Sequence, residues 1–300
     1  MTHLFIINPQ SGNHSINLVL DSIEFLAKKY QLKYKIIITK YPGHVKKIFS
    51  DLDSNQNRVY IFGGDGTIND AIQTIDSNLK ISFIPIGSGN DFFRYFQSKY
   101  SIQDLLEETI NGIEVCVDVG QVENKRFMNS FSLGFDADVA YDADKLIRKK
   151  TIKRELAYKV AALKNLIKPN FTEIELEFDN QKIVVNTLIF AVLNGRYYGG
   201  GFNPTPLAFI NDGKLDLCLI NKLNHFQIIT LLKKYLDGKH LNNKNVQYHQ
   251  SKHFKIKAEK EFSYEIDGEI YHAKNLEISI LEKQLKMIVP KQFINELYFK

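Results

Sequence analysis

Apolar runs alternate with amphipathic segments through the first 110 residues, and this alternation constrains the fold more than any other feature of the sequence. Four runs have the composition of buried strands: "HLFIINP", "KYKIIITK", "RVYIF" and "ISFIPIG". Between the first two, Ile16, Val19 and Ile23 recur at helical spacing, and further helices are predicted from about His44 and from about Asn69. Strands that alternate with helices predict a parallel, doubly wound α/β sheet.

Three loops rich in turn residues follow three of these strands: "NPQSGNHS", "GGDGTIND" and "GSGNDFFR". Ligands of a doubly wound sheet bind beyond the carboxyl ends of its strands, so we expect the loops to converge on one ligand. Gly63, Gly64 and Gly66 allow the backbone to approach that ligand closely. Backbone N–H groups and the N-terminus of the following helix favour a phosphate there.

These loops also contain carboxylates. A carboxylate beside a phosphate needs an explanation, because both groups are negatively charged. The spacing matches neither G-x-x-x-x-G-K-[ST] nor G-x-G-x-x-G, and Asp65 would repel a polyphosphate unless a cation such as Mg²⁺ lay between them. Asp91 adds a second carboxylate. Asp118 lies within an otherwise apolar strand, where it either faces solvent or is buried with a partner. One cluster of Asp65, Asp91 and Asp118 would account for all three.

The pattern changes near residue 115. Many short, often alternating strands follow, and they predict an antiparallel sheet packed on another sheet. Two helices interrupt them, at about 153–168 and 225–237, and Asp267-Gly268 predicts a β-hairpin. We therefore divide the chain into an α/β domain at 1–120, a β-rich domain at 121–285, and a C-terminal segment at 286–300 that packs back on the first domain.

Positive charge gathers in one segment, Lys145–Lys168, which holds nine Lys and Arg and one Glu. Its apolar residues fall at helical spacing and predict one amphipathic basic helix. They are Leu156, Val160, Leu163 and Ile167. Two interpretations stay open. The helix packs its apolar stripe on the core, or it contacts an anionic surface, either membrane headgroups or nucleic acid.

Composition is that of an ordinary globular protein, with 44% hydrophobic and 24% charged residues. No apolar run reaches the roughly 18 residues that a membrane span needs, and we expect no signal peptide before "LFIINP". Cys116 and Cys218 are predicted to be buried thiols in a reducing compartment, not zinc ligands.

Eight motifs occur in an order that is similar to one known family. They are "NPQSG", "GGDGTIND", "PIGSGNDFFR", "DVG", "NSFSLGFDADV", "GRYYGGGFNPTP", "INDGKLDL" and "IDGE". From Asn8 to about Glu269 the chain resembles the soluble bacterial diacylglycerol kinases, which share their catalytic domain with sphingosine and ceramide kinases. The resemblance implies a Rossmann-like α/β domain of the NAD-kinase and phosphofructokinase type, followed by an antiparallel β-sandwich.

The resemblance also implies residue roles. Glu269 matches the catalytic base. Asp65, Asp91 and Asp118 match the acids that hold catalytic Mg²⁺ through water. Asp212 matches a structural metal ligand, together with the backbone carbonyls of Phe209 and Lys214. The positions that match ATP contacts are Asn8, Pro9, Gln10, Ser11, Gly12, Thr39, Gly64, Asp65, Gly66, Thr67, Ile68, Asn69, Asp70 and Ser88. Asn13 stands where the family often has Lys or Arg, which weakens the expected charge balance of the acidic network.

The implied function is an ATP- and Mg²⁺-dependent lipid kinase that transfers the γ-phosphoryl group to a lipid hydroxyl. Diacylglycerol, giving phosphatidic acid, is the expected acceptor. A lipid kinase is expected to be a cytoplasmic protein, peripheral at the inner face of the membrane, with its lipid substrate there. The basic segment 145–168 would then contact that anionic surface. The resemblance also implies dimers in some members.

Three alternatives remain. A kinase of a soluble acceptor such as NAD shares the "GGDGT" loop, but "GSGNDFFR" and "INDGKLDL" argue against it. A nucleotide-binding regulator without turnover has Asn13 as its only support. A nucleic-acid binder could use the basic segment, but the acids around the glycine loops fit it poorly, so we expect no nucleic-acid partner.

Overall fold

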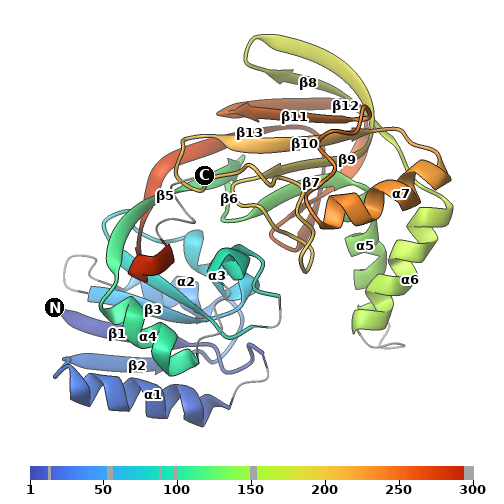
Figure 1. The fold of residues 1–300 in the computed structure, drawn as a ribbon. Helices are drawn as coiled ribbons and strands as arrows, with labels where there is room; N and C mark the ends of the chain where they lie inside the picture. Colours follow the sequence, from blue (N-terminus) through green and yellow to red (C-terminus); the bar gives the residue numbers. More distant parts are fainter. Residues whose placement is uncertain (13–14, 53–56, 88, 97–100, 149–153, 294–300) are drawn as a thin grey trace. The chain divides into compact units, whose positions relative to one another are not determined.

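The computed structural model describes residues 1–12, 15–52, 57–87, 89–96, 101–148 and 154–293 (Figure 1). The chain forms two compact units. Unit 1 contains Met1–Val119, Phe209–Gly213 and Leu281–Lys300, and unit 2 contains Gly120–Ala208 and Lys214–Ile280.

Unit 1 is built on a parallel sheet in which β1 (Thr2–Ile7) lies between β2 (Tyr34–Ile38) and β3 (Asn57–Gly63), and β4 (Lys80–Pro85) pairs with β3. The end of β13 (Glu269–Val289) adds a further parallel strand beside β4. The predicted parallel α/β sheet is therefore confirmed.

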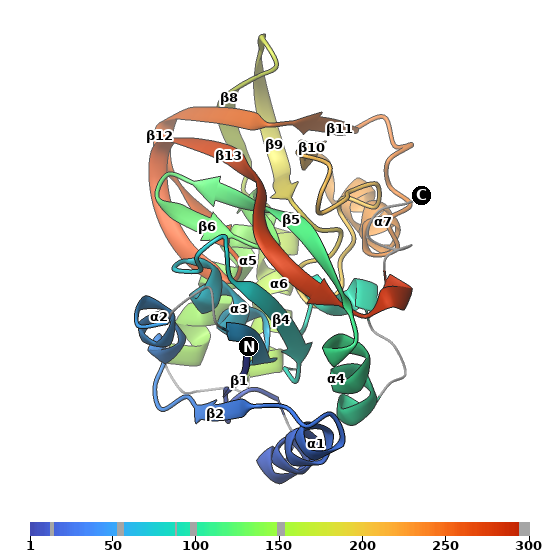
Figure 2. The same ribbon diagram turned by 90° about the vertical axis from the view of Figure 1, so that its left-hand side faces the viewer.

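Helices cover both faces of this sheet (Figure 2). On one face α1 (Ile16–Lys29) and α4 (Ile102–Ile110) share a buried cluster with strand residues such as Phe5 and Phe62. The other face carries α2 (His44–Ser50) and α3 (Asp65–Ile72), which contact each other. The helix that we predicted from about Asn69 thus begins four residues earlier, directly after Gly64, because the glycine loop itself supplies the first helical turn.

Unit 2 is an antiparallel β structure, as predicted. Its strands are β6 (Lys125–Phe127), β7 (Ser130–Gly134), β8 (Thr172–Phe178), β9 (Gln181–Leu193), β10 (Leu215–Asn221), β11 (Val246–Ser251) and β12 (His253–Ile266), with parts of β5 (Ile113–Val122) and β13. Figure 2 shows β5 and β13 side by side, in agreement with their pairing. The predicted hairpin at Asp267-Gly268 is confirmed, since both residues have positive φ (43° and 90°) and Ile266 pairs with Glu269.

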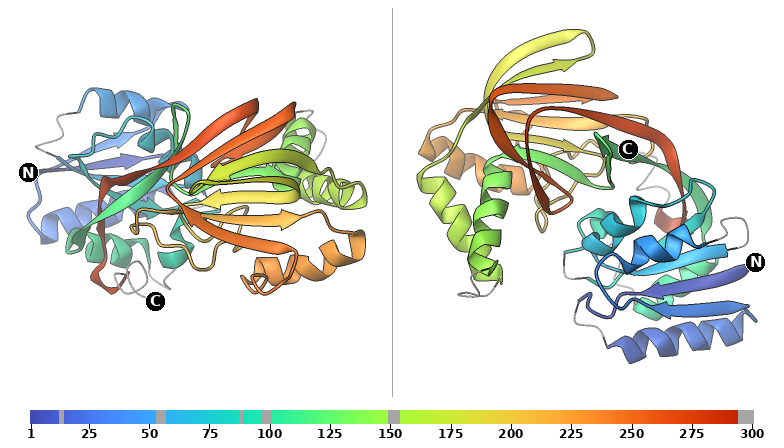
Figure 3. Two further views of the ribbon diagram at one scale, coloured as in Figure 1. Left: turned by 90° about the horizontal axis from the view of Figure 1, so that it is seen from above. Right: turned by 180° about the vertical axis from the view of Figure 1, so that it is seen from behind.

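Three helices gather at one end of unit 2 (Figure 3). They are α5 (Phe135–Arg148), α6 (Arg154–Ile167) and α7 (His225–Leu236). The last two were predicted and α5 was not. The prediction of one basic helix over Lys145–Lys168 is wrong, because this segment is divided between α5 and α6, which pack on each other through Ala143, Ala157 and Ala161. In the part of the chain that the structure describes, no helix is long and apolar enough to span a bilayer.

Cys218 is buried, as predicted, whereas Cys116 is half-buried, and neither of them forms a disulfide with a described residue.

Candidate active site

Three loops of unit 1 touch through their backbones, which confirms the predicted convergence. A Cβ atom on Gly87 would lie 2.6 Å from the Cα of Gly64, so the loops after β3 and β4 are in direct backbone contact. A Cβ atom on Gly12 would lie 1.7 Å from the carbonyl oxygen of Ile86. The glycines are therefore required for the approach of loop to loop.

Side-chain hydrogen bonds join the first loop to α3. The Nδ2 group of Asn8 donates to Oγ1 of Thr67 at 2.9 Å, and Oγ of Ser11 lies 3.3 Å from the same oxygen. Asn8 also accepts the N–H of Gln10 at Oδ1. The loop after β1 is thus fixed above the N-terminus of α3, where the unpaired N–H groups of a helix favour an anion.

Gly12 gives a direct test of this arrangement. Gly12→Ala is expected to lower the free energy of unfolding by about 2 kcal/mol or more, because Gly12 has φ +71° and its new Cβ would overlap Ile86. Gly66→Ala is the matched control, since Gly66 lies in α3 with nothing within 4 Å of its Cβ position and alanine favours a helix. Chemical denaturation measures both. Equal stability of the two variants would contradict the close contact.

Asp65 is the first residue of α3, and its carboxylate is turned toward the loop after β4. Burial, and secondarily the charge of Asp91, raise the pKa of Asp65, while the backbone N–H groups of Asn90, Asp91 and Phe92 act in the opposite direction. Oδ1 of Asp65 is buried and accepts no hydrogen bond from any described residue. Oδ1 of Asn90 is likewise buried, with no donor among the residues that the structure describes. Two such oxygens beside a second carboxylate fit a hard cation such as Mg²⁺.

Asp91 is buried and its Oδ1 accepts a hydrogen bond from Nε of Arg94 at 2.8 Å. Arg94 therefore offsets part of the negative charge that Asp65 and Asp91 place at the loop junction. The structure brings these two predicted acids together.

Asp118 is fully buried, and the alternative in which it faces solvent is excluded. Its Oδ2 accepts the N–H of Gly213 at 2.8 Å, and its Oδ1 accepts the N–H of Lys283 at 2.7 Å. Burial raises the pKa of Asp118, and these two hydrogen bonds oppose that shift. The predicted partners are therefore present, and those observed include two backbone amides.

The three aspartates do not form one set of direct metal ligands. Among the described residues, no group of three or more His, Cys, Asp or Glu side chains is placed to hold a metal ion. The structure pairs Asp65 with Asp91 and ties Asp118 to residues 210–213, since its own N–H donates to the carbonyl of Ile210. Their Mg²⁺ roles through water stay predictions.

The segment around Asp212 has one neighbour that the sequence did not indicate. Asp212 is exposed, and Gly213 beside it has φ +72° and a Cβ position 3.1 Å from Oε2 of Glu282. Glu282 lies in β13, and the sequence around it gives no indication of this contact. Phe209 and Lys214 lie on either side, and the structural metal assigned to Phe209, Asp212 and Lys214 stays a prediction.

The other predicted nucleotide residues have varied surroundings. Thr39 is buried, and its N–H donates to the carbonyl oxygen of Ile7. Ile68 has a buried side chain, which leaves its backbone as the group that could contact a ligand. Asp70 accepts the N–H of Gly43 at 3.0 Å and lies 3.3 Å from Nζ of Lys46, so it fixes the start of α2. Pro9 and Gln10 are exposed, Asn69 is buried, and Ser88 and Asn13 lie outside the described residues.

Glu269 belongs to unit 2, where it is the first residue of β13 and is exposed. The hydroxyl of Tyr271 donates to Oε2 of Glu269. The two side chains share one face of the strand because they are two residues apart. Burial and the bond to Glu269 raise the pKa of Tyr271, so its hydroxyl keeps its proton for that bond. Sequence reasoning missed Tyr271, although the spacing in "IDGEIY" is the signal that could have found it.

The hairpin that carries Glu269 is anchored by Asp267. Its carboxylate accepts three backbone N–H groups, from the two residues before β7 and from the first residue of that strand: Met128 at 2.8 Å, Asn129 at 3.1 Å and Ser130 at 2.8 Å. Sequence analysis gave Asp267 only a turn role. The three bonds fix the turn directly before Glu269.

Two family models match successive parts of the chain. Residues 2–122 match the family model of the diacylglycerol kinase catalytic domain, and residues 129–289 match that of the YegS C-terminal NAD kinase beta sandwich-like domain. A diacylglycerol kinase of Bacillus subtilis is 28% identical over 239 residues, which cover 78% of each chain. A diacylglycerol kinase of Staphylococcus haemolyticus is 24% identical over 295 residues, 97% of this chain and 89% of that one.

Solved structures agree in fold. A crystal structure of a diacylglycerol kinase from Bacillus anthracis superposes with a TM-score of 0.76 at 21% identity and covers 98% of each chain. An NAD kinase from Archaeoglobus fulgidus, solved in complex with ATP, gives a TM-score of 0.54 at 10% identity, covering 98% of this chain and 95% of that one. The predicted NAD-kinase-like fold is thereby confirmed. The chain therefore belongs to the lipid-kinase family that joins a diacylglycerol kinase catalytic domain to a YegS-type C-terminal domain.

Proposed function

We propose that this protein transfers the γ-phosphoryl group of ATP to the free hydroxyl of diacylglycerol, giving phosphatidic acid and ADP, and that it requires Mg²⁺. The observation that carries the proposal is the junction of three glycine loops around Asp65, whose buried Oδ1 meets no donor among the described residues. The curated relatives named diacylglycerol kinase support the choice of acceptor.

The loops of unit 1 would bind the nucleotide. The first amides of α3 and the loop Asn8–Gly12 present N–H groups to a polyphosphate, as helix N-termini and glycine turns do. Asp65 and Asp91 would hold Mg²⁺, directly or through water, and the ion would neutralise charge on the phosphates. Arg94 holds Asp91 in position.

Glu269 would act as the general base. Its carboxylate accepts the proton of the acceptor hydroxyl as the oxygen bonds to the γ-phosphorus, and the bond from that phosphorus to the β-phosphate oxygen breaks. ADP leaves with that oxygen. Positioning and charge neutralisation supply most of the rate acceleration in such a transfer.

The test is transfer of labelled phosphate from Mg-ATP to diacylglycerol in mixed micelles, with NAD as the competing acceptor. Labelled phosphatidic acid, lost on addition of a chelator, is the expected product. Label in NADP would show a soluble acceptor instead. ATP binding without transfer to diacylglycerol, NAD or total lipid extract would show a regulator without turnover.

Tyr271→Phe tests how Glu269 is held. We expect kcat to fall about 3- to 10-fold with little change in KM for ATP, because one hydrogen bond to the carboxylate is lost while the ring stays packed. The ring keeps Lys125, whose Nζ lies 4.3 Å from its centre, and Tyr264 at 5.6 Å. Tyr264→Phe is the matched control and is expected to keep the wild-type kcat. Equal kcat values for wild type and Tyr271→Phe would show that the hydroxyl does not position the base.

A further inference from the structure

The loop after β2, "KYPGH", carries an exposed pair of rings that the proposed function does not use. Tyr41 is 50% exposed, and its ring centre lies 4.7 Å from that of His44, with the two planes 33° apart. The backbone N–H of Lys40 donates to Nδ1 of His44 at 3.2 Å. Pro42 restricts the residue before it to extended backbone, and Gly43 has φ +80°. The turn therefore favours one position of the Tyr41 ring, against His44.

Asp70 of α3 holds this loop beside the candidate nucleotide site. Its Oδ2 accepts the N–H of Gly43 at 3.0 Å, and its Oδ1 lies 3.3 Å from Nζ of Lys46 in α2. Asp70 comes five residues after Asp65, the first residue of α3, and this separation is roughly 7.5 Å along the helix axis. The loop is thus attached to α3 beyond the N-terminal amides that would bind phosphate, and a ribose spans a separation of this size.

The order of the strands gives the direction in which the base would extend. The sheet runs β4, β3, β1, β2, and Asp65 and Asp91 come after β3 and β4. Neighbouring strands are about 4.8 Å apart, so β2 lies roughly 10 Å from β3 along this edge. On the β4 side, Pro290 and the buried Phe293 line, with Pro85, a cavity of only ≈ 20 Å³, which has room for about one water. A nucleotide whose phosphates reach Asp65 therefore has its base toward β2.

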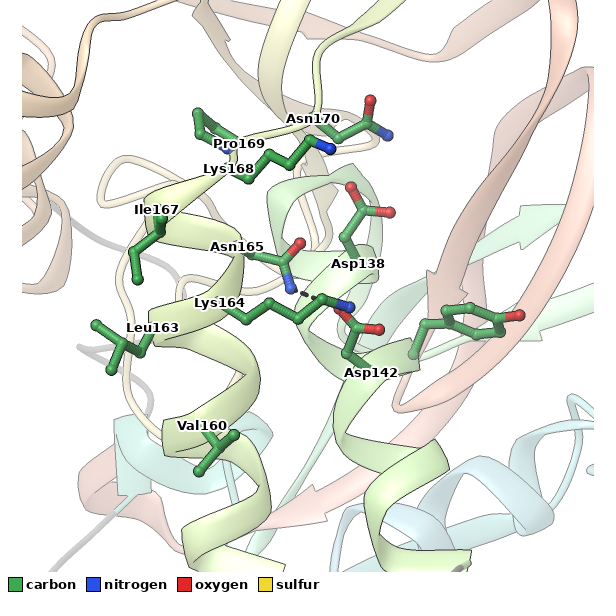
Figure 4. A pocket seen from close by; sticks show the side chains of 11 residues that line it. Asp138, Asp142, Val160, Leu163, Lys164, Asn165, Ile167, Lys168, Pro169 and Asn170 are labelled. Atoms are coloured by element: carbon green, nitrogen blue, oxygen red, sulfur yellow. Dashed lines mark hydrogen bonds and ion pairs between the residues drawn. The ribbon is translucent and has the colours of Figure 1, made fainter.

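The groove of ≈ 700 Å³ between α5 and α6 fits a base less well (Figure 4). Its aromatic residue, Tyr141, already has Nζ of Lys145 4.0 Å from the centre of its ring. Asp142 accepts hydrogen bonds from Lys164 and Asn165 at 2.8 and 2.9 Å. The apolar stripe of α6 is exposed, so the interpretation in which it packs on the core is wrong, but it contains no ring that could stack on a base. Its exposed fractions are 49%, 44%, 59% and 67% for Leu156, Val160, Leu163 and Ile167.

We propose that the ring of Tyr41 stacks on the purine base of the bound nucleotide, and that His44 holds this ring in position. The proposal rests on the proposed function, which makes ATP the phosphoryl donor. Aromatic side chains stack on bases because both have flat π faces, and a purine offers a larger face than a pyrimidine does. Because Nδ1 of His44 accepts the N–H of Lys40, the ring proton of His44 is on Nε2. A backbone contact therefore fixes His44 whether or not a nucleotide is bound.

Calorimetric titration with Mg²⁺ and adenylyl imidodiphosphate, a non-hydrolysable analogue of ATP, tests the stacking directly. Tyr41→Ala is expected to bind the analogue about tenfold more weakly than the wild type does, because the base loses its stacking partner. Tyr41→Phe keeps the ring and should bind at wild-type strength. Tyr34→Ala is the matched control, since Tyr34 stands at the opposite end of β2 and is 42% exposed, and it too should keep the wild-type affinity. Wild-type affinity of Tyr41→Ala would overturn the proposal.

Inorganic tripolyphosphate with Mg²⁺ separates a lost stacking partner from a disturbed phosphate site, because it has phosphates but no base. Tyr41→Ala should bind tripolyphosphate as tightly as the wild type does. An equal loss of affinity for tripolyphosphate and for the nucleotide analogue would show that Tyr41 only supports the phosphate loops, and this result would overturn the proposal.

Kinetics separate this proposal from the proposed function. In transfer to diacylglycerol, Tyr41→Ala should raise KM for ATP about tenfold and keep kcat within about twofold of the wild type, since the base is bound equally in the ground state and the transition state. If the wild type transfers phosphate to no acceptor but Tyr41→Ala still loses affinity for the analogue, the proposed function is wrong and the base site stands. Transfer by the wild type with an unchanged KM for ATP in Tyr41→Ala would mean the reverse.

Discussion

Glu269→Gln is expected to lower the rate of phosphoryl transfer to diacylglycerol about 10²- to 10⁴-fold, the range that a general base contributes. The amide cannot accept the proton of the acceptor hydroxyl, but its oxygen can still accept the hydrogen bond from Tyr271. Because Glu269 is exposed, the thermal midpoint and the affinity for ATP should stay at wild-type values. Single-turnover transfer of labelled phosphate at saturating Mg-ATP measures the effect on the chemical step.

Glu261→Gln is the matched control for this experiment, since Glu261 is another exposed glutamate of unit 2, in β12. It should transfer phosphate at the wild-type rate. Removal of a general base is expected to lower the rate by more than about tenfold. If Glu269→Gln kept more than about a tenth of the wild-type rate, Glu269 would therefore not be the base.

Asp65→Asn is expected to make a more stable protein with little activity. Burial and the charge of Asp91 raise the pKa of Asp65 above its ordinary value of 3.8, so the native state binds this proton more tightly than the unfolded chain does. The contribution of Asp65 to stability therefore falls as pH rises from 3.8 to the raised pKa, and stays low above it. An uncharged amide removes that penalty at neutral pH, whereas loss of the carboxylate should lower kcat about 10²-fold or more.

Thermal unfolding across pH, without metal and with Mg-ATP, checks both parts of this prediction. Without metal, the midpoint of Asp65→Asn at neutral pH should exceed that of the wild type. With Mg-ATP the wild type should gain more than the variant, because ligand that binds the native state raises its stability. A variant that is less stable than the wild type in metal-free buffer would show that the carboxylate is already satisfied by the loop.

Local pattern was enough to predict the first four strands of unit 1 and the helices between them, because these elements follow one another along the chain and each carries its own period. It did not predict the strand that the end of β13 adds beside β4. The same reasoning located the convergence of the loops, since parallel strands end at one edge. It could not predict the partners of Asp118. The backbone N–H groups of Gly213 and Lys283 lie 95 and 165 residues away in sequence. A backbone N–H group is not marked by any particular residue type, so a sequence pattern cannot show which one donates.

Two errors have one physical cause, which is that periodicity gives the apolar side of a helix but not what covers it. The stripe from Leu156 to Ile167 has the spacing of a core helix, yet small residues, Ala157 and Ala161, make the packed side. α5 escaped prediction because four aspartates interrupt "FDADVAYDADKLIR". Their presence lowers apparent amphipathicity although Val139, Ala143 and Leu146 do pack on α6.

The hydrogen bonds from Gly213 and Lys283 to Asp118 also have a consequence for folding during synthesis of the chain. Unit 1 is discontinuous, because it takes in residues 209–213 and the last twenty of the chain. While a ribosome is still synthesising unit 2, the nascent first 119 residues have a buried carboxylate without these two donors and a β4 edge without the end of β13. Such an edge is open to pairing with another chain. Unit 1 is thus translated first but completed only once residues 209–213 and the end of β13 have also been translated.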